Sequence, residues 1–122
     1  MQKSNAKFKS DLIDRCYKFS LEVIKLADTL PNKRSAWVIS DQLIRSATSV
    51  GANLVEGKSA SSRLEFKKFY EISLKSANET KYWLSLLKDA ELAPTDKIDR
   101  LLEEITEISN MLAKAVMTLK KK

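Results

Sequence analysis

The stretch IDRLLEEITEISNMLAKAVMTL, residues 98–119, carries the clearest structural signal in the chain. Its apolar residues recur every three or four positions, at Ile98, Leu101, Ile105, Ile108, Leu112, Ala115 and Leu119. This spacing places them on one face of an α-helix, while the positions between them are mostly charged or small. The stretch therefore predicts an amphipathic helix that buries one face.

Three further segments show the same spacing and predict three more helices. Their apolar positions are Phe8, Leu12, Cys16, Phe19, Val23, Leu26 and Leu30; Ile39, Leu43, Ala47, Val50 and Leu54; and Phe66, Phe69, Ile72, Ala77, Trp83, Leu84 and Leu87. We expect helices over about residues 6–29, 35–57, 62–90 and 95–119, within a single domain that spans residues 1–122.

Proline, glycine and capping residues separate these segments. Pro31 and Pro94 cannot continue a helix, and Gly57 suits the position just after a helix end. Residues Ser62–Glu65 form a capping-box pattern, and Thr95 is expected to cap the last helix. Because short loops bring consecutive helices alongside each other, we expect an all-α fold, an antiparallel up-down-up-down four-helix bundle.

The composition excludes several classes of enzyme. The chain has no histidine, so Ser-His and Cys-His catalysis, imidazole metal sites and Glu-x-x-His di-iron sites cannot form. Its single cysteine, Cys16, cannot make an intrachain disulfide, and it falls on an apolar face where a structural thiol is expected. We therefore expect a protein that is not an enzyme and that uses no metal or cofactor.

The charge balance points to a class of partner. Twenty-two lysines and arginines oppose sixteen aspartates and glutamates, which gives a net charge of +6 and a pI near 9.4. A basic surface attracts polyanions, so RNA or DNA is one expected partner. The N-terminal residues lack the apolar segment of a signal peptide, and no apolar run approaches the ~20 residues that span a membrane. We expect a cytoplasmic protein with no membrane partner and no small-molecule substrate.

Side-chain size and polarity suggest how the helices pack. Ser73, Ser76 and Ala77, in the middle of the third helix, allow a neighbouring backbone to approach closely. A helix in a monomeric bundle needs roughly three apolar positions in seven, and the first two helices exceed this. Their additional apolar residues are Ile13, Tyr17, Ile24, Trp37, Val38, Ile44 and Val55. This surplus predicts a homo-oligomer.

A polar stripe runs along the second predicted helix. It consists of Gln42, Arg45, Ser49, Asn53 and Glu56, and the third helix offers Glu65 and Glu79 nearby. Two interpretations fit: a solvated face, or a partly buried network in which Arg45 bridges carboxylates such as Glu56 or Glu79. The network interpretation predicts that Glu56→Ala lowers the melting temperature more than Glu104→Ala, because Glu104 belongs to an acidic face that is expected to be solvated.

Several motifs resemble a known family. They are Gln42–Ala47 (QLIRSA), Asn53–Gly57 (NLVEG), Glu65–Phe69 (EFKKF) and Lys75–Glu79 (KSANE), with Leu30–Pro31 and Asn110–Leu112 in agreement. Together they look like the signature of the four-helix bundle proteins encoded in 23S rRNA intervening sequences. The resemblance covers nearly the whole chain.

The resemblance implies an α-helical bundle that assembles as a ring, typically a homopentamer, with no established activity. Distant relatives act as accessory proteins to reverse transcriptases, where a basic ring contacts nucleic acid. The chain departs from the pattern at Ile44, Gly51 and Ala60, where relatives often have an arginine, a proline and a basic residue.

Positive charge is expected to collect at one end of the bundle. The start of the first helix, the loop after the second and the end of the fourth would meet there. The cations concerned are Lys3, Lys7, Lys9, Lys58, Arg63, Lys120, Lys121 and Lys122, against Asp11, Glu56 and Glu65. A cyclic ring would point all these ends the same way and attract polyanions, although lysine-rich termini also serve as solubilising tails.

Two functions follow from the sequence. One is a homo-oligomeric bundle of the intervening-sequence family, a pentamer as the resemblance implies, that serves as a nucleic-acid or ribonucleoprotein accessory. The other is a structural or protein-interaction ring with no nucleic-acid partner. Binding to RNA or DNA across a salt series separates them, because the affinity of a polyanion binder falls steeply with salt.

Overall fold

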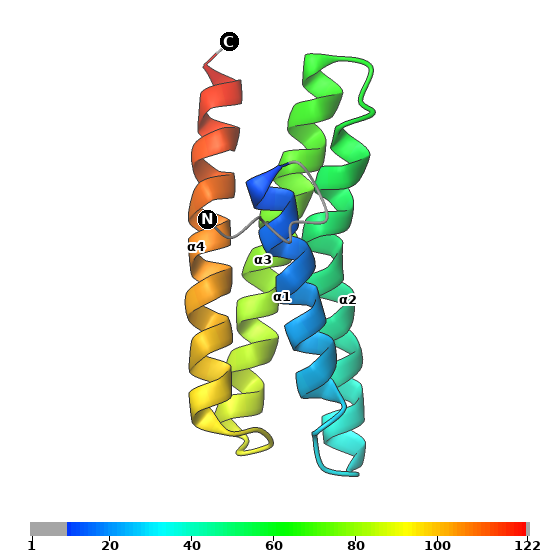
Figure 1. The fold of residues 1–122 in the computed structure, drawn as a ribbon, viewed down its shortest axis with the longest axis vertical. Coiled ribbons are helices and arrows are strands. Elements are labelled where there is room, and N and C mark those ends of the chain that lie inside the picture. Colours follow the sequence, from blue (N-terminus) through cyan, green and yellow to red (C-terminus); the bar gives the residue numbers. More distant parts are fainter. Residues whose placement is uncertain (1–9, 122) are drawn as a thin grey trace, which may run out of the picture.

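Four helices make up the computed structural model, which describes residues 10–121 (Figure 1). They are α1 (Asp11–Ala27), α2 (Arg34–Gly57), α3 (Arg63–Asp89) and α4 (Thr95–Lys120). Within the described residues there is no strand, so the expected all-α four-helix fold is confirmed. Each short connection returns the chain alongside the preceding helix (Figure 1). Each helix packs against two others, in the pairs α1/α2, α2/α3, α3/α4 and α1/α4.

The helix ends follow local chemistry, with three differences from expectation. At the start of α3 the Ser62 side chain accepts a hydrogen bond from the Glu65 amide at 3.1 Å, as the capping box predicts. Pro94, not Thr95, is the N-cap of α4, and Thr95 is its first helical residue. Ser10 caps α1, which begins at Asp11, whereas the expected start at residue 6 lies outside the described residues.

The third difference concerns Gly57, which is the last residue of α2 and does not follow it. Neither glycine of the chain has a positive φ. Each instead lies where two helices approach closely. A Cβ on Gly57 would lie 3.2 Å from the Phe69 Cβ, and one on Gly51 would lie 3.0 Å from the Cys16 Cβ. The glycines therefore serve helix packing rather than turns.

The core consists largely of the predicted apolar faces. Fully buried members include Leu43, Leu54, Leu84, Leu87, Ile98, Ile105, Ile108 and Leu112. Ile13, expected among the surplus residues, belongs to this core. Ile72, expected on the core face of α3, is instead 46% exposed. Phe8 lies outside the described residues.

The helix pairs differ in how closely they pack. Contacts are most extensive between α2 and α3 and least extensive between α1 and α4. Figure 1 also shows that α1 begins well short of the end where α2 and α3 connect, so α2, α3 and α4 extend beyond it. None of the helices described is long and apolar enough to cross a bilayer.

Candidate nucleic-acid interface

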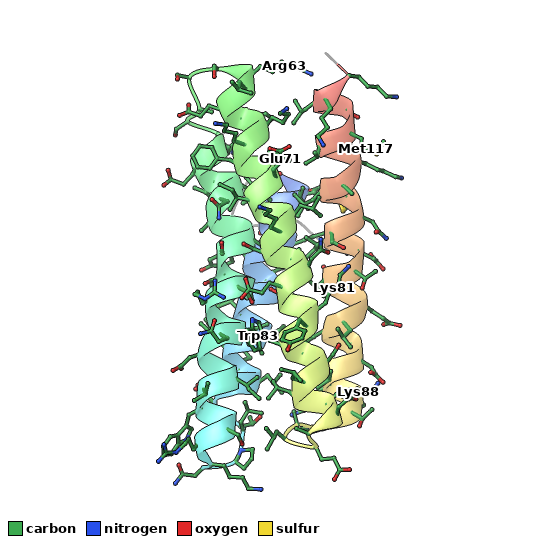
Figure 2. All side chains as sticks on the ribbon, turned by 180° about the vertical axis from the view of Figure 1, so that it is seen from behind. Arg63, Glu71, Lys81, Trp83, Lys88 and Met117 are labelled. Carbon is green, nitrogen blue, oxygen red and sulfur yellow. The ribbon has the colours of Figure 1, made fainter. Side chains whose placement is uncertain are left out.

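The half of the bundle that contains the α2–α3 connection is rich in cations. We call it the basic end and define it by the cations Lys58, Arg63, Lys67, Lys68, Lys75, Lys114, Lys120 and Lys121. They come from the end of α2, the first half of α3 and the end of α4, which lie together (Figure 1). The carboxylates in the same segments are Glu56, Glu65 and Glu71. Figure 2 shows Arg63 at this end of α3 and Lys88 near the other end.

The cations of the basic end lack carboxylate partners. Within residues 10–121, none of them takes part in an ion pair. Arg63 donates a 3.4 Å hydrogen bond to the Leu119 carbonyl oxygen, which links the start of α3 to the end of α4. Glu65 is engaged locally, because its carboxylate accepts a hydrogen bond from the Ser61 amide at 2.6 Å. The positive charge therefore stays available to a ligand.

A groove between α3 and α4 gathers part of this charge. It has a volume of about 480 Å³ and is lined by Lys68, Glu71, Ile72, Leu74, Lys75, Val116 and Lys120. Three ammonium groups and one carboxylate thus surround a shallow apolar floor. Lysine binds phosphate as a flexible point charge, so this groove suits a phosphodiester backbone without reading its sequence.

Half of the cations predicted for this end lie within the described residues. Lys58, Arg63, Lys120 and Lys121 are exposed there. The predicted Lys3, Lys7, Lys9 and Lys122 lie outside those residues. The described part of α1 begins at Asp11, short of this end (Figure 1), and the expected start of the first helix near residue 6 lies outside the described residues.

Sequence reasoning missed four cations of the basic end, namely Lys67, Lys68, Lys75 and Lys114. The prediction counted only charges in loops and at chain ends. The spacing of Lys68 and Lys75, seven residues apart on one helix face, was the signal that could have found them.

The predicted polar stripe divides into separate groups along the α2/α3 contact. Arg45 donates to the Gln42 side-chain oxygen at 3.1 and 2.9 Å, and it pairs with Glu79 of α3. The Trp83 indole donates to Glu79 at 2.9 Å. This hydrogen bond, followed by the hydrogen bond and the positive charge of Arg45, lowers the pKa of Glu79 below its usual value. The side chains of Arg45 and Glu79 are 55% and 34% exposed, so this group is a surface cluster.

Asn53, Glu56 and Glu65 do not join that cluster. Asn53 donates to the Ser49 carbonyl oxygen and hydroxyl, at 2.8 and 2.9 Å. Glu56 is exposed, and its side chain has no hydrogen-bond or ion-pair partner among residues 10–121. Glu65 belongs to the cap of α3. The network that was expected to join Arg45, Asn53 and Glu56 therefore does not form.

Buried hydroxyls, rather than charges, connect α2 and α3 in the interior. Ser73 donates to the Val50 carbonyl oxygen at 2.7 Å, and the hydroxyls of Ser49 and Ser76 lie 2.9 Å apart. Thr80 and Ser46 are also hydrogen-bonded, at 3.0 Å. Small side chains let the two backbones approach, and each hydroxyl finds a partner across or along the helices.

The comparisons with known proteins agree with this architecture. A family model described as 23S rRNA-intervening sequence protein matches residues 9–114. The chain belongs to this family. A crystal structure of a protein of unknown function from the S23 ribosomal protein family of Bacteroides thetaiotaomicron is 35% identical. That similarity has a TM-score of 0.81 and covers 86% of this chain and 97% of that one. No curated protein matches.

The motifs that suggested the family lie mainly on α2 and α3. They supply Arg45 and Glu79 to the surface cluster, and Ser46 and Ser76 to the buried hydroxyl bonds. The resemblance and the most extensive helix contact among the described residues thus involve the same two helices.

A second charged cluster links α1 to α4, on a face that was expected to be solvated. Arg15 donates to both carboxylate oxygens of Glu104, at 2.9 and 2.7 Å, and to Glu107 at 2.7 Å. These hydrogen bonds raise the pKa of Arg15. Glu104 is therefore the partnered carboxylate and Glu56 the solvated one, which reverses the expected order of the two alanine substitutions.

Cys16 is a structural thiol. Its side chain is buried in the core at 1% exposure, and burial raises its pKa to about 12. A thiol in this state is neutral and inaccessible. Among residues 10–121 there is also no group of three or more cysteines, aspartates or glutamates placed to hold a metal ion.

Proposed function

We propose that this chain is a non-enzymatic, homo-oligomeric bundle that binds RNA or DNA through its basic end. The observation that carries the proposal is the set of eight cations that make no ion pair within the described part of the chain. Outside the basic end, five cations of the described residues are each bound to a carboxylate and five are not, so the basic end differs in that all eight of its cations are unpaired.

The charge arrangement supports contacts to the nucleic-acid backbone rather than to bases. Exposed lysines neutralise phosphates and release counterions, which favours association without sequence preference. The groove between α3 and α4 places Lys68, Lys75 and Lys120 around one site. A phosphate there would meet several ammonium groups and the single carboxylate of Glu71.

The assembly is proposed from exposed apolar side chains on α1 and α2. Trp37 and Val38 are 56% and 57% exposed, and Leu21, Ile24 and Val55 are each at least 40% exposed. Burying them between copies in a closed ring, with five copies as the proposed number, avoids an open filament. A ring would also set the basic ends of all protomers on one rim.

Binding to a generic RNA and a generic duplex DNA, measured by fluorescence anisotropy across a salt series, tests the proposal. We expect the logarithm of the affinity to fall linearly with the logarithm of the salt concentration. The variant Lys68→Gln/Lys75→Gln/Lys120→Gln should bind much more weakly at low salt. The matched control, Lys33→Gln/Arg34→Gln/Lys97→Gln, removes equal charge from the other end and should bind nearly as well as the wild type.

Equal affinity of the two triple variants would refute the assignment to the basic end. No measurable binding of the wild type at low salt would favour the second candidate, a structural or protein-interaction ring. That candidate rests on the exposed apolar side chains of α1 and α2 alone.

Light scattering tests the assembly separately. A pentamer predicts a mass near five times 13.8 kDa at micromolar concentration, and a mass near 13.8 kDa would end the oligomer proposal. Replacing Trp37 and Val38 with serine should shift the mass towards the monomer, because both are exposed apolar side chains.

A further inference from the structure

A groove between α1 and α4 takes no part in the proposed function. It has a volume of about 490 Å³, within the range of small-molecule sites, and lies where the two helices make their least extensive contact. It runs along α1 from Arg15 to Leu26 and reaches Thr29, just after the helix end. Its floor is apolar and is formed by Phe19, Leu26 and Leu101.

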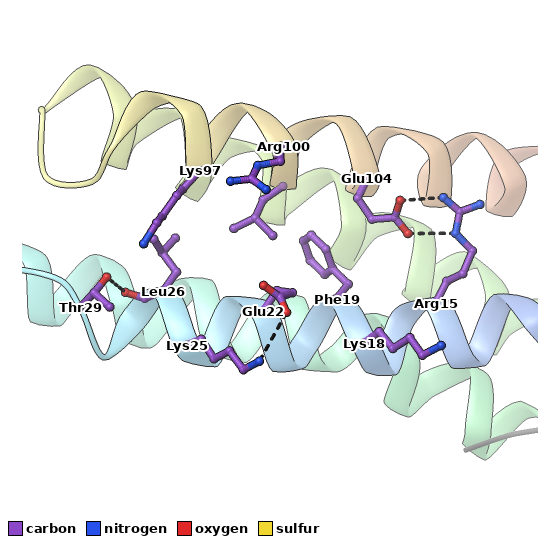
Figure 3. Close-up of a pocket in the computed structure, with 11 residues that line it drawn as sticks. Arg15, Lys18, Phe19, Glu22, Lys25, Leu26, Thr29, Lys97, Arg100 and Glu104 are labelled. Atoms are coloured by element: carbon purple, nitrogen blue, oxygen red, sulfur yellow. Dashed lines mark hydrogen bonds and ion pairs between the residues drawn. The ribbon is translucent and has the colours of Figure 1, made fainter. Parts of the chain in front are cut away.

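An ion-pair cluster spans one end of this groove. There Arg15 reaches across from α1 to the Glu104 carboxylate on α4, at 2.7 and 2.9 Å (Figure 3). Glu107 accepts a further hydrogen bond from the same guanidinium. The Arg15 guanidinium at this end is therefore already bound to two carboxylates.

The other end of the groove is cationic. Lys97 projects from α4 towards α1 and Arg100 lies along α4 next to it (Figure 3), and neither makes a hydrogen bond or ion pair through its side chain within the described residues. Lys25 stands opposite them on α1, 3.7 Å from Glu22, which is a weak pairing. An apolar floor therefore leads to two positive groups that have no partner.

We infer that this groove binds a free amphiphile with one anionic head group and a short alkyl or aryl body. The body would lie on Phe19, Leu26 and Leu101, and the head group would accept hydrogen bonds from Lys97 and Arg100. An anionic amphiphile is the ligand that complements both parts of the groove. A neutral apolar molecule would make no ion pair with Lys97 or Arg100, and a small inorganic anion would leave the apolar floor exposed to water.

The test uses the full-length protein and 8-anilinonaphthalene-1-sulfonate, a fluorescent molecule with an aryl body and an anionic sulfonate. We expect saturable binding at one site per chain, displaced by decanoate and much less by decanol or inorganic phosphate. Equal displacement by decanol, or by phosphate, would overturn the inference, because one half of the amphiphile would then suffice.

Variants assign the binding to the cationic end. Lys97→Gln/Arg100→Gln should weaken binding of the sulfonate about tenfold or more, because it removes two charge-assisted hydrogen-bond donors. Lys97→Arg/Arg100→Lys should retain it, which distinguishes lost charge from a collapsed groove. The matched control Lys33→Gln/Arg34→Gln should bind as the wild type does.

Three results would contradict the inference: unchanged binding in Lys97→Gln/Arg100→Gln, equal losses in the charge-retaining variant, or no binding by the wild type. The last would be the result if a second copy of the chain covers the groove. A separate measurement is binding of the protein to anionic vesicles. If the protein binds them and Lys97→Gln/Arg100→Gln abolishes this binding, the two cations contact a membrane surface and the inference of a free amphiphile is wrong.

Discussion

The α2/α3 and α1/α4 contacts solve the same packing problem in different ways. Between α2 and α3 the backbones approach closely, and the interior polar groups are hydroxyls such as Ser73, which donates to the Val50 carbonyl oxygen at 2.7 Å. Between α1 and α4 the helices make fewer contacts, a charged bridge from Arg15 to Glu104 crosses the surface, and a groove of about 490 Å³ remains.

The difference shows that side-chain size controls where a bundle is tight and where it can hold a ligand. Serine and alanine at Ser73, Ser76 and Ala77 leave no bulk between α2 and α3, and they are buried. Longer side chains on α1 and α4 keep those helices apart, and their charged ends meet in solvent. The tight pair makes the most extensive contact of the bundle, and the open pair leaves a groove.

The largest expected effect comes from adding bulk to the tight contact. Ser73→Leu should destabilise the fold by about 1–3 kcal/mol, because Ser73 is fully buried and the helices must separate to admit the side chain. The matched change at the open contact, Leu101→Phe, adds volume towards the groove and should cost about 0.5 kcal/mol or less. Urea unfolding measures both. Similar costs would show that the two contacts do not differ in tightness.

An intermediate effect is expected at the charged bridge of the open contact. Glu104→Ala should cost about 1 kcal/mol, because its carboxylate accepts two hydrogen bonds from Arg15 and both side chains are only about one-third exposed. Glu56→Ala should change stability by less than about 0.5 kcal/mol, as expected for a solvated side chain.

A double-mutant cycle with Arg15→Ala and Glu104→Ala isolates this interaction from other effects of the substitutions. A coupling free energy near zero would mean that the bridge adds nothing to stability. A larger loss of stability in Glu56→Ala than in Glu104→Ala would support the network that the sequence suggested for α2.

The smallest effect concerns the surface cluster beside the tight contact. The pKa of Glu79 is lowered from its usual 4.5, first by the Trp83 hydrogen bond and then by Arg45. A lowered pKa in the folded state means that the carboxylate adds stability above about pH 4.5 and that this stability is lost as pH falls through the folded-state pKa. Because both charged side chains are substantially exposed, we expect at most about 1 kcal/mol.

Comparing Glu79→Gln with the wild type across pH measures this contribution. The two proteins should differ at pH 7 and converge in acid, where the wild-type carboxyl is also neutral. A difference that stays constant with pH would assign the effect to side-chain packing against Trp83 rather than to charge.

Much of the fold could be predicted because helical periodicity is a local property. The spacing of Ile98, Ile105, Ile108 and Leu112 fixes one face of α4, and all four are fully buried. The capping pattern at Ser62 was equally local and is confirmed. Ile72 fits the same spacing yet is 46% exposed, because a helix face is wider than the surface its neighbours cover.

The candidate sites were less predictable, because they depend on which helices meet. Arg45 and Glu79 were correctly placed together from their positions on facing helices. Glu104 was assigned to a solvated face, since nothing near it in sequence reveals Arg15, which lies 89 residues away. The groove beside Lys97 and Arg100 had no sequence signal at all, because it arises from the spacing between two helices.

The sequence by itself determined the four helices, the apolar face of each and the family, because all three depend on residue types at fixed short spacings. Only the tertiary structure decided which charges are neutralised. Ion pairing requires side chains to meet within about 4 Å, and those distances depend on how the helices pack. Within residues 10–121, packing left the cations of the basic end without carboxylate partners, while it joined Arg15 to Glu104 and Glu107.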